Sequence, residues 1–295
     1  MKIIVLIPIY KVKFSRIKNL IENLNHKVFK IVCIDDQCPF NSGSKLQKYK
    51  FKNLKIIFNK KNLGVGGAMK EGYKYIKKLN YNYAVKIDGD GQLNPNDALQ
   101  MTRYAHRNKI DYVIGTRFEN TSKNFKSMPK IRWYGNKLLS IYSKICSGEY
   151  EIQDFLNGMI CISKNNLNKI NLENVRNNFL FETSMIYENA KLNNKICNFP
   201  IKVKYFKDKS NFKPSKEFFK FLIFNSVKFM KRIFISYFIK KISINTFIIS
   251  LFIYFLIILT QAFVYAENLR EIVLILLINI YLLIMFIFLD YKKAT

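Results

Sequence analysis

The stretch that decides the fold is Tyr83-Ala-Val-Lys-Ile-Asp-Gly-Asp-Gly-Gln92. Residues 83–87 form a largely apolar run of strand length, and the run ends in two aspartates, Asp88 and Asp90, each followed by glycine. Three similar runs precede it at 2–9, 28–34 and 54–58, with helix-like stretches between them at 15–25, 44–49 and 66–79. Strands that are apolar throughout and alternate with helices predict an α/β fold, with a parallel sheet covered on both faces.

Polar residues follow the predicted strands at their carboxyl ends, where ligands bind in such sheets. They are Tyr10, Asp35, Asp36, Asn59, Asp88 and Asp90. Asp88 and Asp90 can converge on a hard divalent cation, Mg²⁺ or Mn²⁺, which prefers oxygen ligands and keeps positions open for substrate phosphates. The alternative is a polar turn in which both aspartates only cap the next helix.

A glycine cluster occurs in Asn62-Leu-Gly-Val-Gly-Gly-Ala-Met-Lys-Glu-Gly-Tyr73. It places glycines at the start of a predicted helix, where exposed backbone amides favour a phosphate. The stretch is not a Walker loop, because no Gly-Lys-Ser/Thr follows at the required spacing. It is not the dinucleotide fingerprint either, because it does not follow the first strand.

Composition excludes several classes of protein. The 295 residues are 49% hydrophobic and 15% aromatic, which excludes a disordered chain. The five cysteines are scattered without paired spacing, which excludes a small disulfide scaffold. The chain has only two histidines, His26 and His106, which are too few for a histidine-rich metal site. The formal net charge of +29 suggests nucleic-acid binding at first, but no motif that reads RNA or DNA occurs, and we expect no nucleic-acid partner.

The end of the chain predicts a membrane anchor. Residues 242–266 and 272–289 carry no charge, and a membrane-spanning helix needs about 20 apolar residues. The short link between them makes a hairpin of two transmembrane helices, which can also pack against copies of itself as a homo-oligomer. Lysines flank both ends of the hairpin, so the positive-inside rule places both termini and the globular domain in the cytoplasm. The alternative is a buried helical hairpin in a soluble core.

Residues 213–241 predict a basic amphipathic juxtamembrane helix. From Lys202 to Lys241 there are 12 basic and two acidic residues. A basic amphipathic helix beside membrane spans is typical of a segment that lies on an anionic leaflet. We therefore expect anionic lipid as a partner, and the alternative is a solvated face that packs on the globular domain.

The order of the motifs over residues 3–212 resembles family-2 glycosyltransferases of the GT-A fold. The stretches that carry the resemblance are Ile7-Pro-Ile-Tyr10, Ile34-Asp-Asp36, the glycine cluster 62–68, Asp88-Gly-Asp-Gly-Gln92, Gly115-Thr-Arg-Phe118, Met128-Pro129 with Arg132 and Asn136, Asp154 with Asn157-Gly158, and Phe181-Glu182. With two C-terminal membrane helices, the chain is similar to the polyprenyl-phosphate (dolichol-phosphate-mannose-synthase-like) branch. The resemblance implies a Rossmann-like mixed sheet in a catalytic domain over residues 1–212.

The resemblance also implies roles for individual residues. The residues matching nucleotide-sugar binding are Pro8, Tyr10, Asp35, Asp36, Asn62, Gly64, Lys70, Asp88 and Gly89. Those matching the metal–diphosphate site are Asp88, Asp90 and Gln92. Those matching the acceptor phosphate are Arg117, Arg132 and Asn136, and the catalytic set is Asp90, Arg117, Arg132, Asp154 and Glu182. Two positions depart from the family pattern, because Tyr10 is followed by Lys11-Val-Lys13 without an acid, and Gln37-Cys38 replaces the usual Gly-Ser.

The function implied is metal-dependent transfer of a sugar from a nucleotide-diphosphate sugar to a polyprenyl phosphate such as undecaprenyl phosphate, with inversion at the anomeric carbon. An anionic acceptor phosphate needs positioning by Arg117 and Arg132 more than it needs a base. A second reading has a sugar hydroxyl of a lipid-linked glycan as acceptor, in surface polysaccharide synthesis of the cell envelope, with Glu182 or Asp154 as base. A reading of another class is a catalytically inactive, membrane-tethered binding protein.

Overall fold

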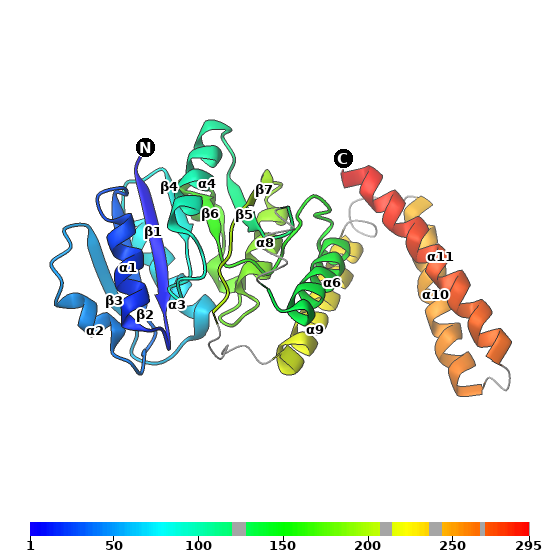
Figure 1. The fold of residues 1–295 in the computed structure, drawn as a ribbon. Coiled ribbons are helices and arrows are strands. Elements are labelled where there is room, and N and C mark those ends of the chain that lie inside the picture. The colour runs from blue at the N-terminus through cyan, green and yellow to red at the C-terminus, as the bar shows by residue number, and fades with distance from the viewer. Residues whose placement is uncertain (120–127, 207–213, 236–243, 266–268, 295) are drawn as a thin grey trace. The chain divides into compact units, whose positions relative to one another are not determined.

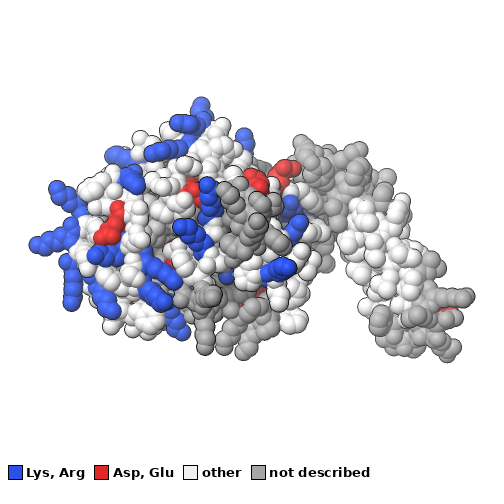
Figure 2. All heavy atoms as spheres, in the orientation of Figure 1, with Lys and Arg blue, Asp and Glu red and all other residues white. Residues whose placement is uncertain are grey.

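The computed structural model describes residues 1–119, 128–206, 214–235, 244–265 and 269–294. The chain divides into two compact units. The first comprises Met1–Ser143 and Glu151–Phe221, and the second comprises Lys144–Tyr150 and Leu222–Thr295. All residues of the predicted site belong to the first unit. Lys and Arg side chains are spread over the face of this unit that Figure 2 shows, with few Asp and Glu among them.

The first unit is built on one seven-stranded sheet with the order β3-β2-β1-β4-β6-β5-β7. The strands are β1 (Ile3–Ile9), β2 (Lys30–Asp35), β3 (Leu54–Phe58), β4 (Tyr83–Lys86), β5 (Tyr112–Thr116), β6 (Ile160–Ser163) and β7 (Ile196–Pro200). The first four are the predicted strands, and they pair in parallel. Their carboxyl ends therefore meet at one edge of the sheet, which we call the carboxyl edge (Figure 1).

The expectation of a wholly parallel sheet is wrong at one strand. β6 pairs antiparallel with both β4 and β5, while β5 and β7 are parallel. The sheet is therefore mixed, as the family resemblance implies. Because β6 runs in the opposite direction, the residues that enter it, rather than those that leave it, lie at the carboxyl edge. This direction brings Gly158 close to the end of β4, where its carbonyl oxygen accepts a hydrogen bond from Lys86.

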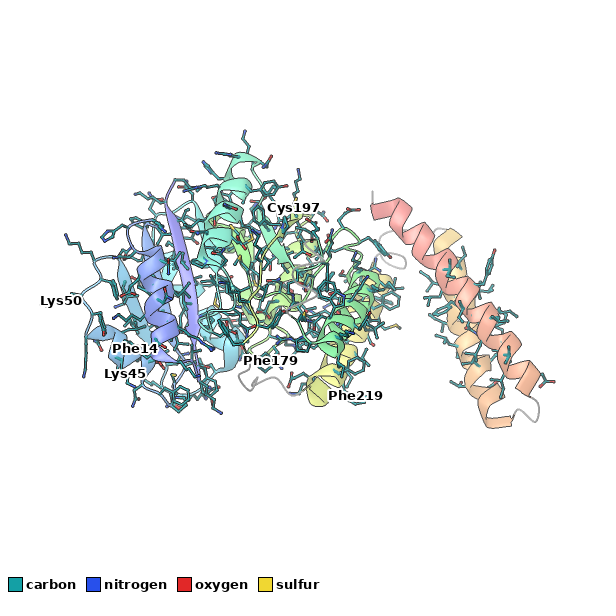
Figure 3. The ribbon with its side chains drawn as sticks, viewed as in Figure 1. Phe14, Lys45, Lys50, Phe179, Cys197 and Phe219 are labelled. Atoms are coloured by element: carbon teal, nitrogen blue, oxygen red, sulfur yellow. The ribbon has the colours of Figure 1, made fainter. Side chains whose placement is uncertain are left out.

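Helices cover both faces of the sheet because successive side chains of each strand point to opposite faces. In β1, Val5, Ile7 and Ile9 pack in one apolar cluster, and Ile4 and Leu6 pack in the other. The first cluster includes side chains of α1 (Phe14–Leu24), α2 (Ser42–Gln47) and α4 (Pro95–Arg107). The second includes side chains of α3 (Gly64–Lys77), α7 (Lys164–Lys169), the short 3₁₀ helix η1 (Leu172–Asn174) and α8 (Phe181–Lys191). Side chains fill both layers (Figure 3).

The remaining helices are α6 (Lys130–Ser147), α9 (Pro214–Ile233), α10 (Ile244–Tyr265) and α11 (Leu269–Ala294). α10 and α11 lie side by side as a helical hairpin (Figure 1). Among the described residues, no helix combines the length and the apolar composition that crossing a membrane requires. The predicted helix 213–241 and the predicted span 242–266 both include residues outside the described ones, namely 213, 236–243 and 266.

Candidate active site

The acidic pair at the end of β2 is buried. Asp35 is 4% exposed, and its carboxylate accepts hydrogen bonds from the backbone N–H groups of Cys38 at 2.7 Å and Gly43 at 2.8 Å. A Cβ at position 43 would lie 2.4 Å from Asp35 Oδ2, so only glycine admits this approach. Asp35 thereby closes the loop between β2 and α2. Its implied contact with the nucleotide stays a prediction.

Asp36 occupies the N-terminus of α3. Its carboxylate accepts hydrogen bonds from the N–H groups of Leu63 at 2.9 Å and Gly64 at 2.8 Å, and from Asn59 Nδ2 at 2.7 Å. A carboxylate is stabilised there by the helix dipole and the unpaired amides. Gly64 adopts φ +79, a backbone conformation that favours glycine.

The sequence of the glycine cluster suggested that its backbone amides are open to a phosphate, but the structure shows other groups of the chain bound to them. Asn177 O accepts from the N–H groups of Gly66 at 2.8 Å and Gly67 at 3.0 Å, while Asp36 binds the preceding amides. A Cβ at Gly66 would lie 2.0 Å from Arg176 O, which explains the glycine by close approach of the backbone. Asn62 stabilises the same turn, donating from Nδ2 to Asp36 O at 3.2 Å.

Four ionisable side chains meet at the end of β4. Lys86 Nζ lies 2.6 Å from Asp88 Oδ1 and 3.0 Å from Glu182 Oε1, with Glu182 supplied by the first turn of α8. Burial alone would lower the pKa of the Lys86 ammonium, but Asp88 and Glu182 outweigh it and the pKa rises above its usual value. Burial, reinforced by the negative charge of Asp88, raises the pKa of Asp90 to about 6.

The donor set fits a divalent cation that shares its ligands with a substrate. Within the described residues no cluster of three or more His, Cys, Asp or Glu side chains is placed to hold a metal ion. Asp88 and Asp90 nevertheless supply two carboxylates beside each other, and Mg²⁺ typically takes one or two carboxylates and completes its shell with water and substrate phosphates. A Cβ at Gly158 would lie 2.0 Å from Asp88 Oδ2, so the glycine keeps room for this carboxylate.

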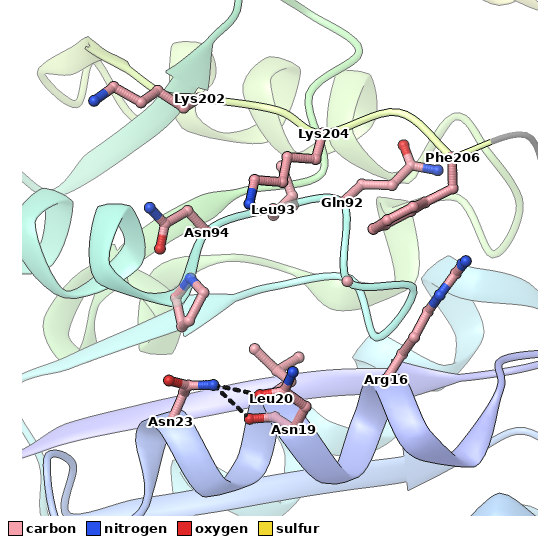
Figure 4. Close-up of a pocket in the computed structure, with 12 residues that line it drawn as sticks. Arg16, Asn19, Leu20, Asn23, Gln92, Leu93, Asn94, Lys202, Lys204 and Phe206 are labelled. Atoms are coloured by element: carbon pink, nitrogen blue, oxygen red, sulfur yellow. Dashed lines mark hydrogen bonds between the residues drawn. The ribbon is translucent and has the colours of Figure 1, made fainter. Parts of the chain in front are cut away.

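A pocket of about 350 Å³ lies beside the loop that carries the two aspartates (Figure 4). Its lining comes from α1, the loop after β4 and the segment after β7, and comprises Arg16, Asn19, Leu20, Asn23, Gly91, Gln92, Leu93, Asn94, Pro95, Lys202, Lys204 and Phe206. Arg16 Nη1 donates to Asp90 O at 3.3 Å, and its guanidinium lies 4.1 Å from the centre of the Phe206 ring. Gln92, an implied metal ligand, lines this pocket, and its N–H donates to Asp90 Oδ1 at 2.9 Å.

Three residues of the implied acceptor side come together after β5. Arg117 Nε lies 2.6 Å from Asp154 Oδ2, and Arg117 Nη2 lies 2.7 Å from Asp154 Oδ1. Asn136 Oδ1 accepts from Nη1 and Nη2 of the same guanidinium at 3.3 Å. Burial would lower the pKa of Arg117, but Asp154 outweighs it and raises the pKa. Arg117 is buried and its guanidinium is bound by both Asp154 and Asn136, so it shapes the site from within rather than lying open to an acceptor.

Arg132 has a different environment. It lies in the first turn of α6, it is exposed, and its guanidinium is 5.2 Å from the centre of the Tyr205 ring. Tyr205 donates from its hydroxyl to Met128 Sδ at 3.2 Å and also contributes to the raised pKa of Arg117. The Tyr205 ring covers one side of the guanidinium, and an exposed guanidinium can present its edge, which carries the N–H groups, to a phosphate.

The other implied donor residues lie around the carboxyl edge. Pro8 belongs to β1, and its carbonyl oxygen would be 3.3 Å from a Cβ at Gly89, so the two backbones pack closely. Tyr10 follows β1 and is 37% exposed, with the Lys11 ammonium 5.3 Å from its ring centre. Lys70 lies on α3, where burial and the charges of neighbouring cations lower its pKa.

Sequence reasoning missed Lys86 and Arg16. Lys86 carried a signal, because it is the single charge in the run 83–87 and a charged residue in a buried strand requires a partner. Its contact with Glu182 could not be inferred, since that residue is far away in the sequence and arrives on α8. Arg16 gave no local signal, because its contact with Asp90 O depends on how α1 packs beside the loop after β4.

Comparison with known proteins places the chain. Its residues 4–173 match the model of glycosyl transferase family 2. It is 32% identical to a UDP-N-acetylglucosamine–dolichyl-phosphate N-acetylglucosaminyltransferase of Methanococcus voltae over 69% of this chain and 86% of that one. It is also 27% identical to an uncharacterized protein of Methanocaldococcus jannaschii over 48% of this chain and 61% of that one.

Solved structures share the fold. Glucosyl-3-phosphoglycerate synthase from Mycobacterium tuberculosis, in complex with Mn²⁺, UDP-glucose and phosphoglyceric acid, superposes with a TM-score of 0.55 at 12% identity, covering 76% of this chain and 79% of that one. The chain belongs to glycosyl transferase family 2 and is a glycosyltransferase that uses a nucleotide sugar.

Proposed function

We propose that the enzyme transfers a sugar from a nucleotide-diphosphate sugar to a polyprenyl phosphate, with a divalent cation at Asp88 and Asp90. The observation that carries the acceptor class is the contrast between Glu182 and Arg132. The Glu182 side chain is only 12% exposed and its carboxylate binds Lys86 at 3.0 Å, so it is poorly placed to take a proton from an acceptor, whereas Arg132 is exposed and its guanidinium lies over the Tyr205 ring. The dolichyl-phosphate acceptor in the name of the Methanococcus voltae relative supports the same class.

The residues at the end of β4 would hold Mg²⁺ or Mn²⁺. A cation there supplies Lewis-acid stabilisation of the leaving diphosphate. Asp88 and Asp90 would bind the cation, and Gln92 follows them on the same loop. Asp90 is oriented by its own chain, because its Oδ1 accepts from the Gln92 N–H at 2.9 Å. The Mn²⁺ and UDP-glucose bound by the glucosyl-3-phosphoglycerate synthase support this assignment.

The reaction needs no proton transfer from the acceptor. A phosphate monoester carries one to two negative charges near neutral pH, because its second pKa is about 6. One of its oxygens attacks the anomeric carbon, the bond from that carbon to the diphosphate breaks, and the bonding electrons leave with the nucleoside diphosphate. A single displacement of this kind inverts the anomeric carbon. Arg132 would donate hydrogen bonds to the acceptor phosphate oxygens. Arg117, Asn136 and Asp154 would form the inner side of the acceptor site.

A panel of nucleotide sugars, incubated with undecaprenyl phosphate and with dolichyl phosphate, tests the assignment with product detected by mass. With a phosphate acceptor, Arg132→Ala is expected to lower the transfer rate about 100-fold, because a charge-assisted bidentate contact is lost. Glu182→Gln at saturating Mn²⁺ is expected to keep at least about a tenth of the rate, since no base is needed. Arg103→Ala, which removes an exposed arginine from α4, is the matched control.

The opposite result identifies the second acceptor class. If Glu182→Gln loses the rate and Arg132→Ala keeps it, the acceptor is a sugar hydroxyl of a lipid-linked glycan, since a hydroxyl requires a general base. Failure of every nucleotide sugar to give product with either lipid phosphate contradicts the proposed acceptor as well.

We further propose that the second unit anchors the enzyme in a membrane, with the catalytic unit and both termini on the cytoplasmic side. The charge-free runs 242–266 and 272–289 support the anchor. Large apolar side chains of the hairpin are exposed, and contiguous apolar surface of this kind requires a cover. They are Ile253, Tyr254, Leu256, Ile257, Val273, Leu276, Leu277, Ile280, Tyr281 and Ile284.

Two amphipathic helices support contact with anionic lipid. α6 exposes Ile131, Tyr134, Leu138 and Ile141, which share one helix face at spacings of three and four residues. α9 exposes Phe219, Ile223, Val227 and Met230 in the same manner, and lysines are interspersed along it. Apolar faces beside lysines suit the boundary between lipid headgroups and acyl chains.

The anchor predicts how the full chain is extracted from cell membranes. We expect it to stay in the membrane pellet through washes with about 1 M salt, where the Debye length falls to about 3 Å, and through washes with alkaline carbonate, and to be released by detergent. Release by salt alone indicates electrostatic attachment through basic residues. Release by carbonate indicates a peripheral protein. Either outcome contradicts the anchor, and protease protection of a C-terminal tag in inverted vesicles contradicts the cytoplasmic terminus.

A further inference from the structure

Lys86 lies at the centre of the site, and neither the proposed reaction nor the family motifs use it. Its side chain is fully buried at the end of β4. The ammonium has three oxygen partners, Asp88 Oδ1 at 2.6 Å, Gly158 O at 2.9 Å and Glu182 Oε1 at 3.0 Å. A lysine ammonium has three donors and no acceptor, so these contacts satisfy it completely. The ammonium is therefore fixed in place rather than free to move toward a ligand.

The same contacts fix Asp88. Its Oδ1 is bound to Lys86, and its Oδ2 lies so close to Gly158 that a Cβ there would come within 2.0 Å. The side chain is still 37% exposed, so the carboxylate faces the site while it is held from behind. Asp90 forms no hydrogen bond or ion pair with Lys86 among the described residues, although the charge of Lys86 acts on it, and its carboxylate accepts from the backbone of its own loop.

The ammonium also sets the charge that a cation meets. Asp88, Asp90 and Glu182 would carry three negative charges together, and Lys86 reduces the net charge of the group to two negative charges. A cation that approaches Asp88 is repelled by an ammonium bound to the same carboxylate, and this repulsion is strong in a poorly hydrated site. A donor diphosphate brings further negative oxygens, which restore the attraction for the cation.

We propose that Lys86 is a positioning residue that makes cation binding at Asp88 and Asp90 depend on the donor diphosphate. This inference rests on the proposed cation site and adds the order in which its ligands assemble. Without a nucleotide, Lys86 neutralises part of the charge of Asp88 and the cation binds weakly. With the diphosphate present, the cation gains phosphate oxygens and binds tightly. The coupling is reciprocal, so the cation tightens the nucleotide by the same factor.

The test measures Mn²⁺ binding to the full-length chain in detergent by electron paramagnetic resonance, with and without UDP or GDP, using the nucleotide that binds more tightly. In the wild type we expect the nucleotide to tighten Mn²⁺ about tenfold or more. In Lys86→Met we expect this factor to fall at least about threefold, through tighter Mn²⁺ binding in the absence of nucleotide. Lys74→Met removes an exposed lysine paired with Glu71 on α3 and is expected to leave the factor unchanged.

A second variant changes the charge in the other direction. Glu182→Gln removes one carboxylate and leaves Asp88 as the only carboxylate bound to Lys86, so Mn²⁺ without nucleotide is expected to bind more weakly than in the wild type. Opposite shifts in the two variants are the signature of a charge effect. A merely structural role of Lys86 weakens Mn²⁺ binding in both variants alike. If Lys86→Met does not fold, Lys86→Gln, which removes the same charge and keeps a hydrogen-bond donor for Asp88, is measured in its place with the same expected fall in the nucleotide factor.

Each result has one reading. Two results overturn the role of Lys86 while the cation site stands. The first is a folded Lys86→Met variant in which the nucleotide tightens Mn²⁺ by the same factor as in the wild type. The second is a Glu182→Gln variant that binds Mn²⁺ without nucleotide as tightly as the wild type, or more tightly. Absence of Mn²⁺ binding to the wild type even with nucleotide overturns the cation site, and the role of Lys86 with it. Sugar transfer in the presence of a chelator has the same consequence for the cation site.

Discussion

Asp90→Asn is expected to lower the rate of sugar transfer by about 1,000-fold or more. The Asp90 carboxylate lies next to Asp88 at the end of β4 and is held by the N–H of Gln92 at 2.9 Å. An amide keeps the shape and the hydrogen bond but loses the charge that a divalent cation requires. Losing a cation at the leaving diphosphate costs several kcal/mol of transition-state stabilisation, and about 4 kcal/mol corresponds to that factor. The rate is measured with saturating nucleotide sugar and acceptor.

Asp97→Asn provides the control for this change. Asp97 is also buried, on α4, where its Oδ2 accepts from the Lys202 N–H at 2.8 Å, and asparagine can keep that bond. We expect Asp97→Asn to stay within about threefold of the wild-type rate. Equal losses in both variants would show that a buried charge at this edge supports the fold rather than the reaction. The rates of both variants are measured at a temperature at which both variants are folded.

Arg117→Ala and Asp154→Ala are expected to have the largest effect on stability. The two side chains form a bidentate ion pair and are 7% and 0% exposed. Removing one partner leaves the other charge buried and unpaired, which typically costs about 3–5 kcal/mol. Unfolding is followed by the fluorescence of the only tryptophan, Trp133, whose ring meets that of Phe118, next to Arg117, at a centroid distance of 5.0 Å.

The double replacement Arg117→Met with Asp154→Leu separates the two contributions. It removes both charges together, so its loss of stability is expected to be smaller than the sum of the single losses. Single variants that unfold like the wild type would mean that the pair is not buried in solution. A stable double variant without transfer activity would show that the pair shapes the acceptor side beyond its effect on folding.

The first half of the fold could be predicted from the sequence because its signals are local. Four apolar runs, each ending in polar residues, mark β1 to β4 to within about two residues, as is usual for strand ends. The direction of β6 could not be predicted in this way. Residues 160–163 are a short buried run, and nothing within the run indicates its orientation, which depends on the long excursion that brings the chain back to β4.

The site was predictable where one motif carries it and unpredictable where distant segments meet. Asp88 and Asp90 stand together in the sequence and in the structure. The glycine cluster was assigned to phosphate because its amides are unpaired in an isolated helix, but Asp36 and Asn177 from two other segments occupy them. Arg117 was assigned to the acceptor from the family resemblance, and its ion pair with Asp154 could not be predicted, because Asp154 lies on the far side of α6 in the sequence.

The antiparallel β6 has a consequence for how this enzyme can vary. The chain leaves the carboxyl edge after β5 and returns to the same edge before β6, so Arg117 and Met159, at the two ends of the intervening segment, both lie at that edge. We expect that such a segment can be exchanged between related enzymes while the sheet, Asp88 and Asp90 are kept, provided that Gly158, which keeps room for Asp88, is retained. On the proposed assignment of Arg117, Arg132 and Asp154 to the acceptor side, a chimera that carries this segment from a relative with another acceptor is expected to take that acceptor and keep the nucleotide sugar of its host.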